Sequence, residues 1–329
     1  MTGVNLRKIL LLAGASLFLV FVPGAQGAPG GPLRVVNSHP LFLATGAPRL
    51  REARCRSFLG ATLTYSSTFE LESSPEWTAS IDLEAAVLTL EAARLLGDRT
   101  EVGAELPVIG YQSGVLDGPL NAYHDAFGFG DYGRHTRPEN DFLFVVKRRG
   151  KTVVEGRAGR IAPGDVRLWL KEAVYRGNPY VSLYGFLDLP TGDPDRGFGS
   201  GELHGGAAVL LDASLRRGLT AYLNGGAVFM GSYRGQEVDV PLHDFLYGGA
   251  GIEWEAAGRL SLLTQLMAQG SPFDTGIREL DTVSLLWSLG LRYGMGEGSA
   301  LEASFSEDPN TAGAPDFMVS LGYRYTFRQ

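Results

Sequence analysis

The sequence predicts an all-β protein, namely a closed antiparallel transmembrane β-barrel of about twelve strands with one short helical insertion. Residues 315–328 alternate as one long terminal strand whose outer face is wholly apolar. Short turns alternate with longer links along the chain, as periplasmic turns and extracellular loops do. Beyond residue 22, no run of about 18 apolar residues is available for a spanning helix, so an exported chain of this kind is soluble or a barrel.

Composition supports the same class and excludes one kind of partner. The 45 glycines among 329 residues are about twice the usual share, and the mean hydropathy of +0.00 is too low for a helical membrane protein. The formal net charge is -7. Because a surface that binds phosphates in nucleic acid is strongly basic, we expect no nucleic-acid partner.

Residues 1–27 have the features of a secretory signal peptide. Arg7 and Lys8 provide the positive end, residues 9–22 the apolar run, and residues 25–27 a small-residue cleavage site before Ala28. The alternative is an uncleaved anchor, but the break at residues 23–24 favours cleavage.

Residues 28–56 are predicted to be an irregular N-terminal lead-in to the barrel. Four prolines interrupt any regular element there. A basic cluster near its end is interpreted as a solvated turn, with a site for lipid phosphates as the alternative; this cluster consists of Arg49, Arg51, Arg54 and Arg56. Cys55 is the single cysteine, so it has no internal disulfide partner, and we expect an inert buried thiol.

Residues 57–329 are predicted to form the outer-membrane barrel. The expected strands are residues 58–71, 77–93, 100–109, 165–175, 180–189, 202–212, 219–233, 242–256, 259–269, 282–293, 300–306 and 315–328. Tight turns are expected at residues 216–218, 257–258 and 294–298, and long links at residues 191–201, 235–241, 270–280 and 307–314.

The terminal strand also suggests how the barrel is assembled. Its apolar face consists of Phe317, Val319, Leu321, Tyr323, Tyr325 and Phe327. Aromatic rings at a strand end suit the headgroup layer. The pattern resembles the C-terminal signal of bacterial outer-membrane barrels, although Arg328 and Gln329 follow the last aromatic residue here. The expected partners are therefore the lipid bilayer with its outer-membrane lipids and the barrel-assembly machinery.

The polar faces of the strands are predicted to line the lumen. In residues 77–87 apolar side chains alternate with Thr78, Ser80, Asp82 and Glu84, so we expect the carboxylates to point inward. The candidate lumen-lining residues are Asp82, Glu84, Glu101, Lys171, Glu172, His204, Glu253, Glu255, Arg292 and Arg324. In a lumen of about twelve strands such charges can pair across the interior and close it.

Residues 115–135 break the strand rhythm and predict a short amphipathic helix. The candidate plug residues Leu116, Leu120, His124 and Phe127 lie at helical spacing. Because unpaired backbone cannot lie in lipid, we expect this insertion in or across the barrel mouth as a partial plug.

Three stretches have side chains capable of chemistry. His124, Asp125, Asp131 and His135 can in principle bind zinc or run acid/base hydrolysis, but their spacing matches no standard ligand pattern, so a packed loop is favoured and no cofactor is expected. The glycines of residues 197–201 lack the strand-then-helix setting of a phosphate-binding loop. Ser200 and His204 would lie roughly 13 Å apart in a strand, too far for a hydrolase pair.

Several motifs resemble those of domain-of-unknown-function family 3187. They are residues 114–118, residues 124–128, the segment 138–140, residues 163–165 with the lysine-bearing residues 169–171, residues 189–193, and residues 199–201. The resemblance implies a barrel in the outer membrane of a Gram-negative bacterium. It implies no activity and no catalytic residues.

Three functional classes remain open from the sequence. The first is a small pore or passive channel for a small solute. The second is a structural or envelope-assembly barrel with a plugged lumen, and the third is an outer-membrane enzyme that modifies lipid. An open lumen would separate the first class from the second, and a water-exposed nucleophile beside His124 or His204 would favour the third.

Overall fold

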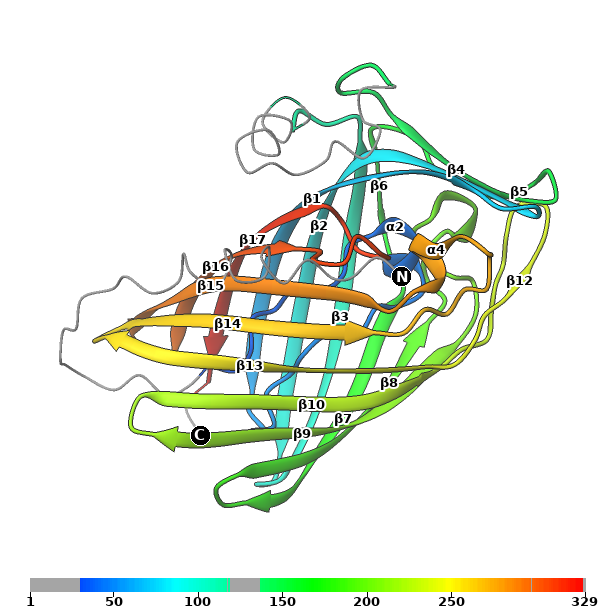
Figure 1. Ribbon diagram of the computed structural model, residues 1–329. Coiled ribbons are helices and arrows are strands. Elements are labelled where there is room, and N and C mark those ends of the chain that lie inside the picture. Colours follow the sequence, from blue (N-terminus) through cyan, green and yellow to red (C-terminus); the bar gives the residue numbers. More distant parts are fainter. Residues whose placement is uncertain (1–29, 117, 119–136, 297, 328–329) are drawn as a thin grey trace.

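The computed structural model describes residues 30–116, 118, 137–296 and 298–327 (Figure 1). The predicted signal peptide, residues 1–27, and most of the predicted helical insertion lie outside these residues. No helix in the described ranges is long and apolar enough to span a membrane.

Twelve long strands make the wall of the barrel. They are β1 (Phe58–Ser73), β2 (Trp77–Leu96), β3 (Thr100–Gln112), β7 (Val166–Arg176), β8 (Tyr180–Leu189), β9 (His204–Arg216), β10 (Leu219–Phe229), β13 (Phe245–Ala257), β14 (Leu260–Gln269), β15 (Ser284–Gly296), β16 (Ser299–Glu307) and β17 (Phe317–Thr326).

Shorter elements extend the wall or lie in its connections. They are α2 (Pro40–Ala44), β4 (Leu143–Arg148), β5 (Lys151–Glu155), β6 (Arg160–Pro163), the 3-10 turn η2 (Pro194–Arg196), β11 (Ser232–Tyr233), β12 (Val240–Pro241) and α4 (Arg278–Asp281).

The wall closes on itself through antiparallel pairing of the first and last strands. β1 pairs with β17, with Phe58 opposite Thr326, and on its other side β1 pairs with β2. β2 pairs with β3, which pairs with β7, and each later barrel strand pairs with the next along the chain. The predicted closed antiparallel barrel of twelve strands is therefore confirmed.

The terminal strand shows the alternation expected of a membrane-facing wall. Leu321 is 59% exposed and Tyr323 41%, whereas Met318 and Arg324 on the opposite face are buried. Leucines and valines of the other strands are exposed on the same outer surface, including Leu63, Leu170, Leu223 and Leu291. This apolar surface faces lipid, because a membrane barrel turns its hydrophobic face outward.

The two ends of the barrel differ. At the short-turn end, defined by the turns after β2, β7, β9, β13 and β15, the connections are two to three residues long where the structure describes them in full. Gly97 and Gly218 have φ values of 67° and 73° in two of these turns, a conformation that glycine adopts without strain. The opposite, long-loop end holds β4, β5, β11, β12 and α4 (Figure 1).

An apolar core closes the long-loop end. Phe42 of α2 packs edge-to-face on Phe273, with ring centroids 5.6 Å apart. Ile81 of β2, Phe144 of β4 and Leu280 of α4 are fully buried in the same cluster. This core joins the long connections to one another and to a segment inside the barrel, so the long-loop mouth is filled by side chains.

Candidate functional site

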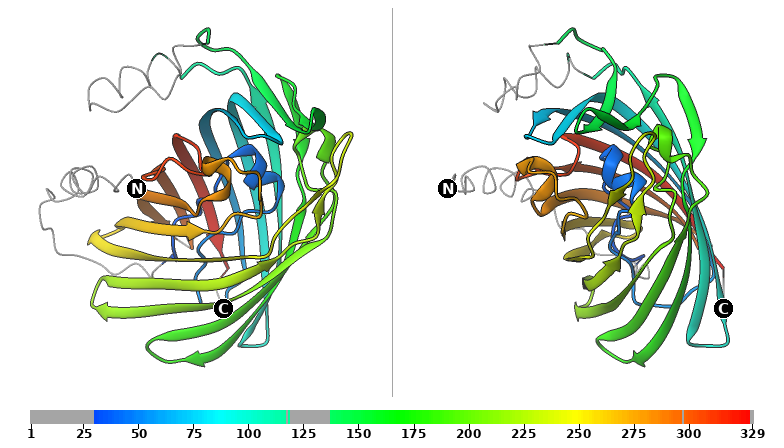
Figure 2. Two further views of the ribbon diagram at one scale, coloured as in Figure 1. Left: turned by 45° about the vertical axis from the view of Figure 1, so that its right-hand side comes forward. Right: turned by 90° about the vertical axis from the view of Figure 1, so that its right-hand side faces the viewer.

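The N-terminal lead-in lies inside the barrel (Figure 2). Gly30 receives a hydrogen bond from Arg324 Nη1 (2.9 Å) near the short-turn end, and His39 contacts Glu70 Oε2 (3.1 Å) near the long-loop end. After α2 the chain returns, and the Arg56 backbone N–H donates to Glu101 Oε2 (2.8 Å). Residues 30–57, here named the plug, therefore cross the lumen twice.

The upward pass, residues 30–39, is held by reciprocal hydrogen bonds and small apolar contacts. Leu33 N–H donates to Gln265 Oε1 (2.9 Å), and Gln265 Nε2 donates back to the Leu33 carbonyl (3.3 Å). Leu33 packs with Leu263 and Met318 of the wall. A Cβ on Gly290 would lie 2.7 Å from Leu33 Cδ2, so a larger residue there would displace this pass.

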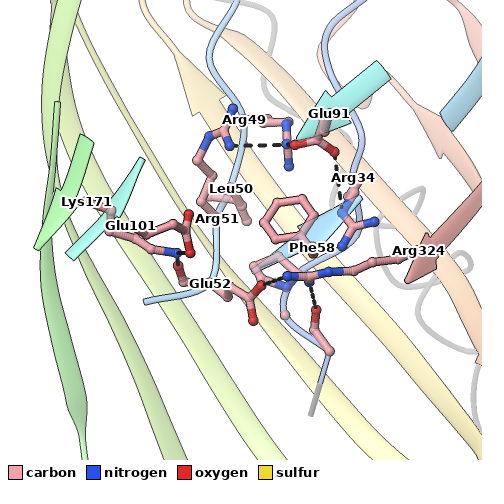
Figure 3. Close-up of a pocket in the computed structure, with 13 residues that line it drawn as sticks. Arg34, Arg49, Leu50, Arg51, Glu52, Phe58, Glu91, Glu101, Lys171 and Arg324 are labelled. Carbon is pink, nitrogen blue, oxygen red and sulfur yellow. Dashed lines mark hydrogen bonds and ion pairs between the residues drawn. The ribbon is translucent and has the colours of Figure 1, made fainter. Parts of the chain in front are cut away.

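The downward pass, residues 46–57, carries two buried arginines against the wall carboxylates Glu91 and Glu105. Figure 3 shows both arginines and Glu91. Arg51 Nη2 donates to Glu105 Oε2 (2.7 Å), and Arg49 forms ion pairs with both Glu105 and Glu91. The Arg51 guanidinium also lies 4.6 Å from the ring centroid of Trp169. The interpretation of this basic cluster as a solvated turn was wrong for Arg49 and Arg51, because strand carboxylates that the sequence does not locate lie beside them.

Wall side chains also satisfy the backbone of the downward pass, which has no strand partner. Asp212 accepts from the N–H groups of Ala53 (3.0 Å) and Arg54 (3.2 Å). Lys171 Nζ pairs with Glu101 (2.8 Å) and donates to the Glu52 carbonyl (3.2 Å). Buried backbone groups need such partners, so these side chains fix the path of the plug.

Two wall arginines hold the plug at the short-turn end. Arg292 pairs with Glu253 (2.8 Å) and Glu302 (2.6 Å), and its Nη2 donates to the Gly31 carbonyl (2.7 Å). Arg324 forms an ion pair with Glu52 of the plug and lies 4.0 Å from the ring centroid of Phe58.

The candidate lumen-lining residues therefore fall into two groups. Those whose side chains face the interior are Glu101, Lys171, His204, Glu253, Arg292 and Arg324, all buried, together with the half-buried Glu255. Whether any of them lines a conducting path stays a prediction.

Asp82, Glu84 and Glu172 lie on the outer face of the wall, contrary to the expectation. Asp82 pairs with Arg137 (2.7 Å), and Glu84 accepts from the N–H groups of Val115 (2.8 Å) and Leu116 (2.5 Å). Glu172 accepts from Thr100 Oγ1 (2.6 Å). The inward face of β2 carries apolar residues instead, because the plug presents Phe42 there; these residues include Ala79, Ile81, Leu83 and Ala85.

Of the candidate plug residues predicted within residues 115–135, only Leu116 is described, as the donor to Glu84. Leu120, His124 and Phe127 lie outside the described residues, as do Asp125, Asp131 and His135. Among the described residues, no group of three or more His, Cys, Asp or Glu side chains is arranged to hold a metal ion.

Ser200 and His204 are in contact, so the predicted separation of roughly 13 Å was wrong. His204 Nε2 lies 2.6 Å from Ser200 Oγ, because Gly201, at φ 78°, turns the chain back before β9 begins. The N–H of Gly231 donates to His204 Nδ1 (3.0 Å), which places the ring proton on Nε2. The imidazole therefore donates a hydrogen bond to the serine hydroxyl. A general base would have to accept the serine proton instead, so this histidine is not arranged as one.

Asp165 completes this buried network at the long-loop end. Its carboxylate accepts from the N–H groups of Gly192 (2.8 Å) and Ser200 (2.9 Å). Burial raises the pKa of Asp165 above its usual value. Ser200 and His204 are 0% and 2% exposed. The cluster ties three connections together and gives no support to a lipid-modifying enzyme.

Two cavities adjoin the plug. One of about 20 Å³ lies between the plug and the wall beside Arg49, Glu91 and Phe58 (Figure 3), room for about one water. The other, of about 460 Å³, lies at the short-turn end and is named the vestibule; it is lined by Arg34, Arg56, Glu253, Arg259, Arg292, Glu302 and Arg324 along with turn glycines and residues of β16 and β17. The plug thus separates the vestibule from the long-loop end.

Comparison with known proteins places the barrel in a family. The sequence matches the family described as "Protein of unknown function (DUF3187)" over residues 17–327. The chain belongs to this family. A search of the curated proteins finds no match to this DUF3187 chain.

Solved structures resemble the DUF3187 barrel. The COG4313 outer membrane channel from Pseudomonas putida F1 aligns with a TM-score of 0.55 and 12% identity, covering 92% of this chain and 100% of that one. The NanC porin aligns at 0.47 with 8% identity, covering 82% and 100%, and the CymD monoaromatic hydrocarbon channel at 0.38 with 11%, covering 89% and 98%. At 12% identity the first shows a shared fold alone, and the other two are too distant to add to it.

Proposed function

We propose that this protein is a channel for small solutes in the outer membrane of a Gram-negative bacterium, and that the plug closes it in the state described here. The observation that carries the proposal is the double pass of residues 30–57 through a lumen whose wall is complete without it. The wall strands pair with one another, so withdrawal of the plug breaks none of the barrel's strand pairing.

The chemistry of the plug supports its release. Its downward pass is held by ion pairs and hydrogen bonds to polar side chains, such as those of Glu105, Asp212 and Lys171. Water can replace such contacts with little net loss, whereas an apolar core cannot be hydrated cheaply. The similar barrel from Pseudomonas putida F1 is named an outer membrane channel, which agrees with this proposal.

A structural barrel with a permanently filled lumen is the second candidate. The apolar cluster around Phe42, Ile81 and Phe273 favours it, because withdrawing α2 would expose buried aromatic surface. Burial of one such side chain contributes about 2 to 3 kcal/mol. The two candidates differ in whether the barrel functions with the plug removed.

Planar-bilayer conductance separates the two candidates. We would compare the refolded mature chain with a variant that lacks residues 30–48, using heat-modifiable migration to show that each barrel is folded. The channel proposal expects low conductance for the mature chain and a large, stable conductance for the deletion variant. A folded deletion variant that does not conduct would refute the channel, and a variant that never folds would favour the structural barrel.

A further inference from the structure

The vestibule is a cavity whose lining contains more arginines than carboxylates. Of its charged lining residues, five are arginines and two are glutamates, Glu253 and Glu302. Two further carboxylates do not line the vestibule but form ion pairs with its arginines: Glu52 with Arg324, and Glu91 with Arg34. Even with these two carboxylates included, the positive groups outnumber the negative ones, so the cavity favours an anion.

Arg34 is a nearly buried arginine of the vestibule that is held to Glu91 by an ion pair alone. Its side chain is 10% exposed, and its nearest carboxylate is Glu91, with Nε 3.6 Å from Oε2. That separation is an ion pair but too long for a hydrogen bond. Within the described residues the Arg34 guanidinium has no hydrogen bond, and the same side chain lines both the vestibule and the smaller cavity. A nearly buried guanidinium with unused donors at a cavity wall lacks an acceptor.

Neighbouring groups hold Arg34 in place for such an acceptor. Arg34 and Arg324 both contact the Phe58 ring, at 5.5 Å and 4.0 Å from its centroid (Figure 3). The Arg34 backbone N–H donates to Glu302 Oε1 (3.0 Å), which fixes the start of the side chain. Arg292 lies on the same wall, bound to Glu302.

We propose that the vestibule binds a phosphate group through Arg34, with Arg324, Arg292 and the exposed Arg259 supplying the surrounding positive charge. The planar guanidinium matches phosphate oxygens and forms charge-assisted hydrogen bonds with them. A cavity of about 460 Å³ accommodates a sugar phosphate or a phospholipid headgroup as well as inorganic phosphate. The site lies at the short-turn end and is complete while the plug is in place, so binding to it can be measured without release of the plug.

Isothermal titration of the refolded mature chain tests this site. Inorganic phosphate is titrated at constant ionic strength in chloride, and short-chain phosphatidylglycerol is titrated in a second arm. We expect saturable binding in at least one arm; binding of phosphate alone indicates a free solute, and binding of the lipid alone indicates a headgroup. Absence of saturable binding in both arms overturns the proposal.

Two variants and one matched control complete the test. Arg34→Gln should lower the affinity about tenfold, because a charged hydrogen-bond donor is lost while Glu91 keeps its pairs with Arg49 and Arg51. Arg259→Glu reverses an exposed rim charge without disturbing the fold and should lower the affinity severalfold. The control is Arg176→Gln, an exposed arginine at the same end that pairs with Asp98 outside the vestibule. Equal affinities for Arg34→Gln, Arg259→Glu and the control would refute the assignment.

Discussion

Replacing Arg49 and Arg51 by glutamine, singly and together, tests whether shared ion pairs hold the plug. Glu105 accepts from Arg51 at 2.7 Å and from Arg49 at 3.3 Å. Glu91 forms an ion pair with Arg49 and lies 3.7 Å from Arg51 Nη1. Each single variant therefore leaves both carboxylates with one plug arginine, whereas the double variant removes both.

The double variant is expected to weaken the attachment of the plug by more free energy than the two single variants added together. Loss of a hydrogen bond to a charged group costs about 2 kcal/mol, which we expect for each single variant. A buried carboxylate without its partner costs about 3 to 5 kcal/mol. In the double variant Glu105 loses both plug arginines and keeps only Arg167 opposite it in the register, and Glu91 keeps only Arg34, so we expect about 6 kcal/mol, a coupling of about 2 kcal/mol. These contacts join plug to wall, so plug release becomes about 10⁴-fold more favourable.

Cys55 provides the assay, because it is the single cysteine of the chain, it is buried, and it lies in the plug. Its maleimide labelling rate should rise modestly in each single variant and steeply in the double variant, in parallel with bilayer conductance. Arg149→Gln is the control, since Arg149 pairs with Glu76 at 2.6 Å on the surface, where ion pairs contribute little. Strictly additive effects on labelling would refute the shared network. Faster labelling without any conductance would refute the channel proposal instead.

Three further predictions concern the wall, assembly and a loop. Leu289→Arg or Ile252→Arg should destabilise the folded barrel by about 2 to 4 kcal/mol in a refolding titration if the substituted residue lies near the bilayer midplane. Leu203→Arg, in an exposed connection, is the control and should cost little. Equal losses of stability would contradict the lipid-facing assignment. Removal of residues 327–329 should prevent outer-membrane delivery, and normal outer-membrane levels on immunoblots would count against an insertion signal. Burial raises the pKa of Asp308, in the link after β16, from 3.8 to about 7. The folded state therefore binds the extra proton between about pH 4 and pH 7, so stability measured in urea should fall as pH rises through this window; Asp308→Asn should remove the dependence, and an unchanged pH profile in that variant would refute it.

The wall was predictable from the sequence because lipid imposes a strict period of two. The apolar face of the terminal strand, which includes Leu321 and Tyr323, was identified from alternation alone, and the twelve strands followed from the turn signals between them. The same rule failed for Asp82 and Glu84. There the interior is not water but the plug, so apolar residues of β2 face inward and carboxylates face outward.

Because the plug fills the interior, the inward-facing Ser288 does not tolerate a large side chain as a water-filled lumen position would. From the sequence, an arginine at Ser288 should cost much less than one at Leu289. Ser288 is 0% exposed and receives a hydrogen bond from Ser306 Oγ (2.8 Å), so an arginine there would also be disruptive.

The location of the plug was not predictable, because irregular segments carry no period. A signal was nevertheless present: arginines recur in the lead-in, Glu91 is an isolated carboxylate on the inward face of β2, and β3 carries Glu101 and Glu105 on its inward face. Charge complementarity between the lead-in arginines and the strand glutamates would have suggested contact, but only the fold brings residues about 50 positions apart together.

The register of the wall shows why the lumen needs the plug's charge. Several interior charges face an opposite charge directly across neighbouring strands: Arg292 faces Glu302, Lys171 faces Glu101, and Arg167 faces both Asp188 and Glu105. Glu91 of β2 faces Glu105 of β3, two like charges that destabilise a sheet when nothing lies between them. Arg49 and Arg51 bind to both carboxylates, so the plug adds two cations to a row of the wall in which Glu105 and Asp188 share Arg167. When the plug leaves, the wall cation in register with these carboxylates is Arg167, which also faces Asp188, so this row holds three carboxylates and one arginine, and an open pore should therefore concentrate cations at this level.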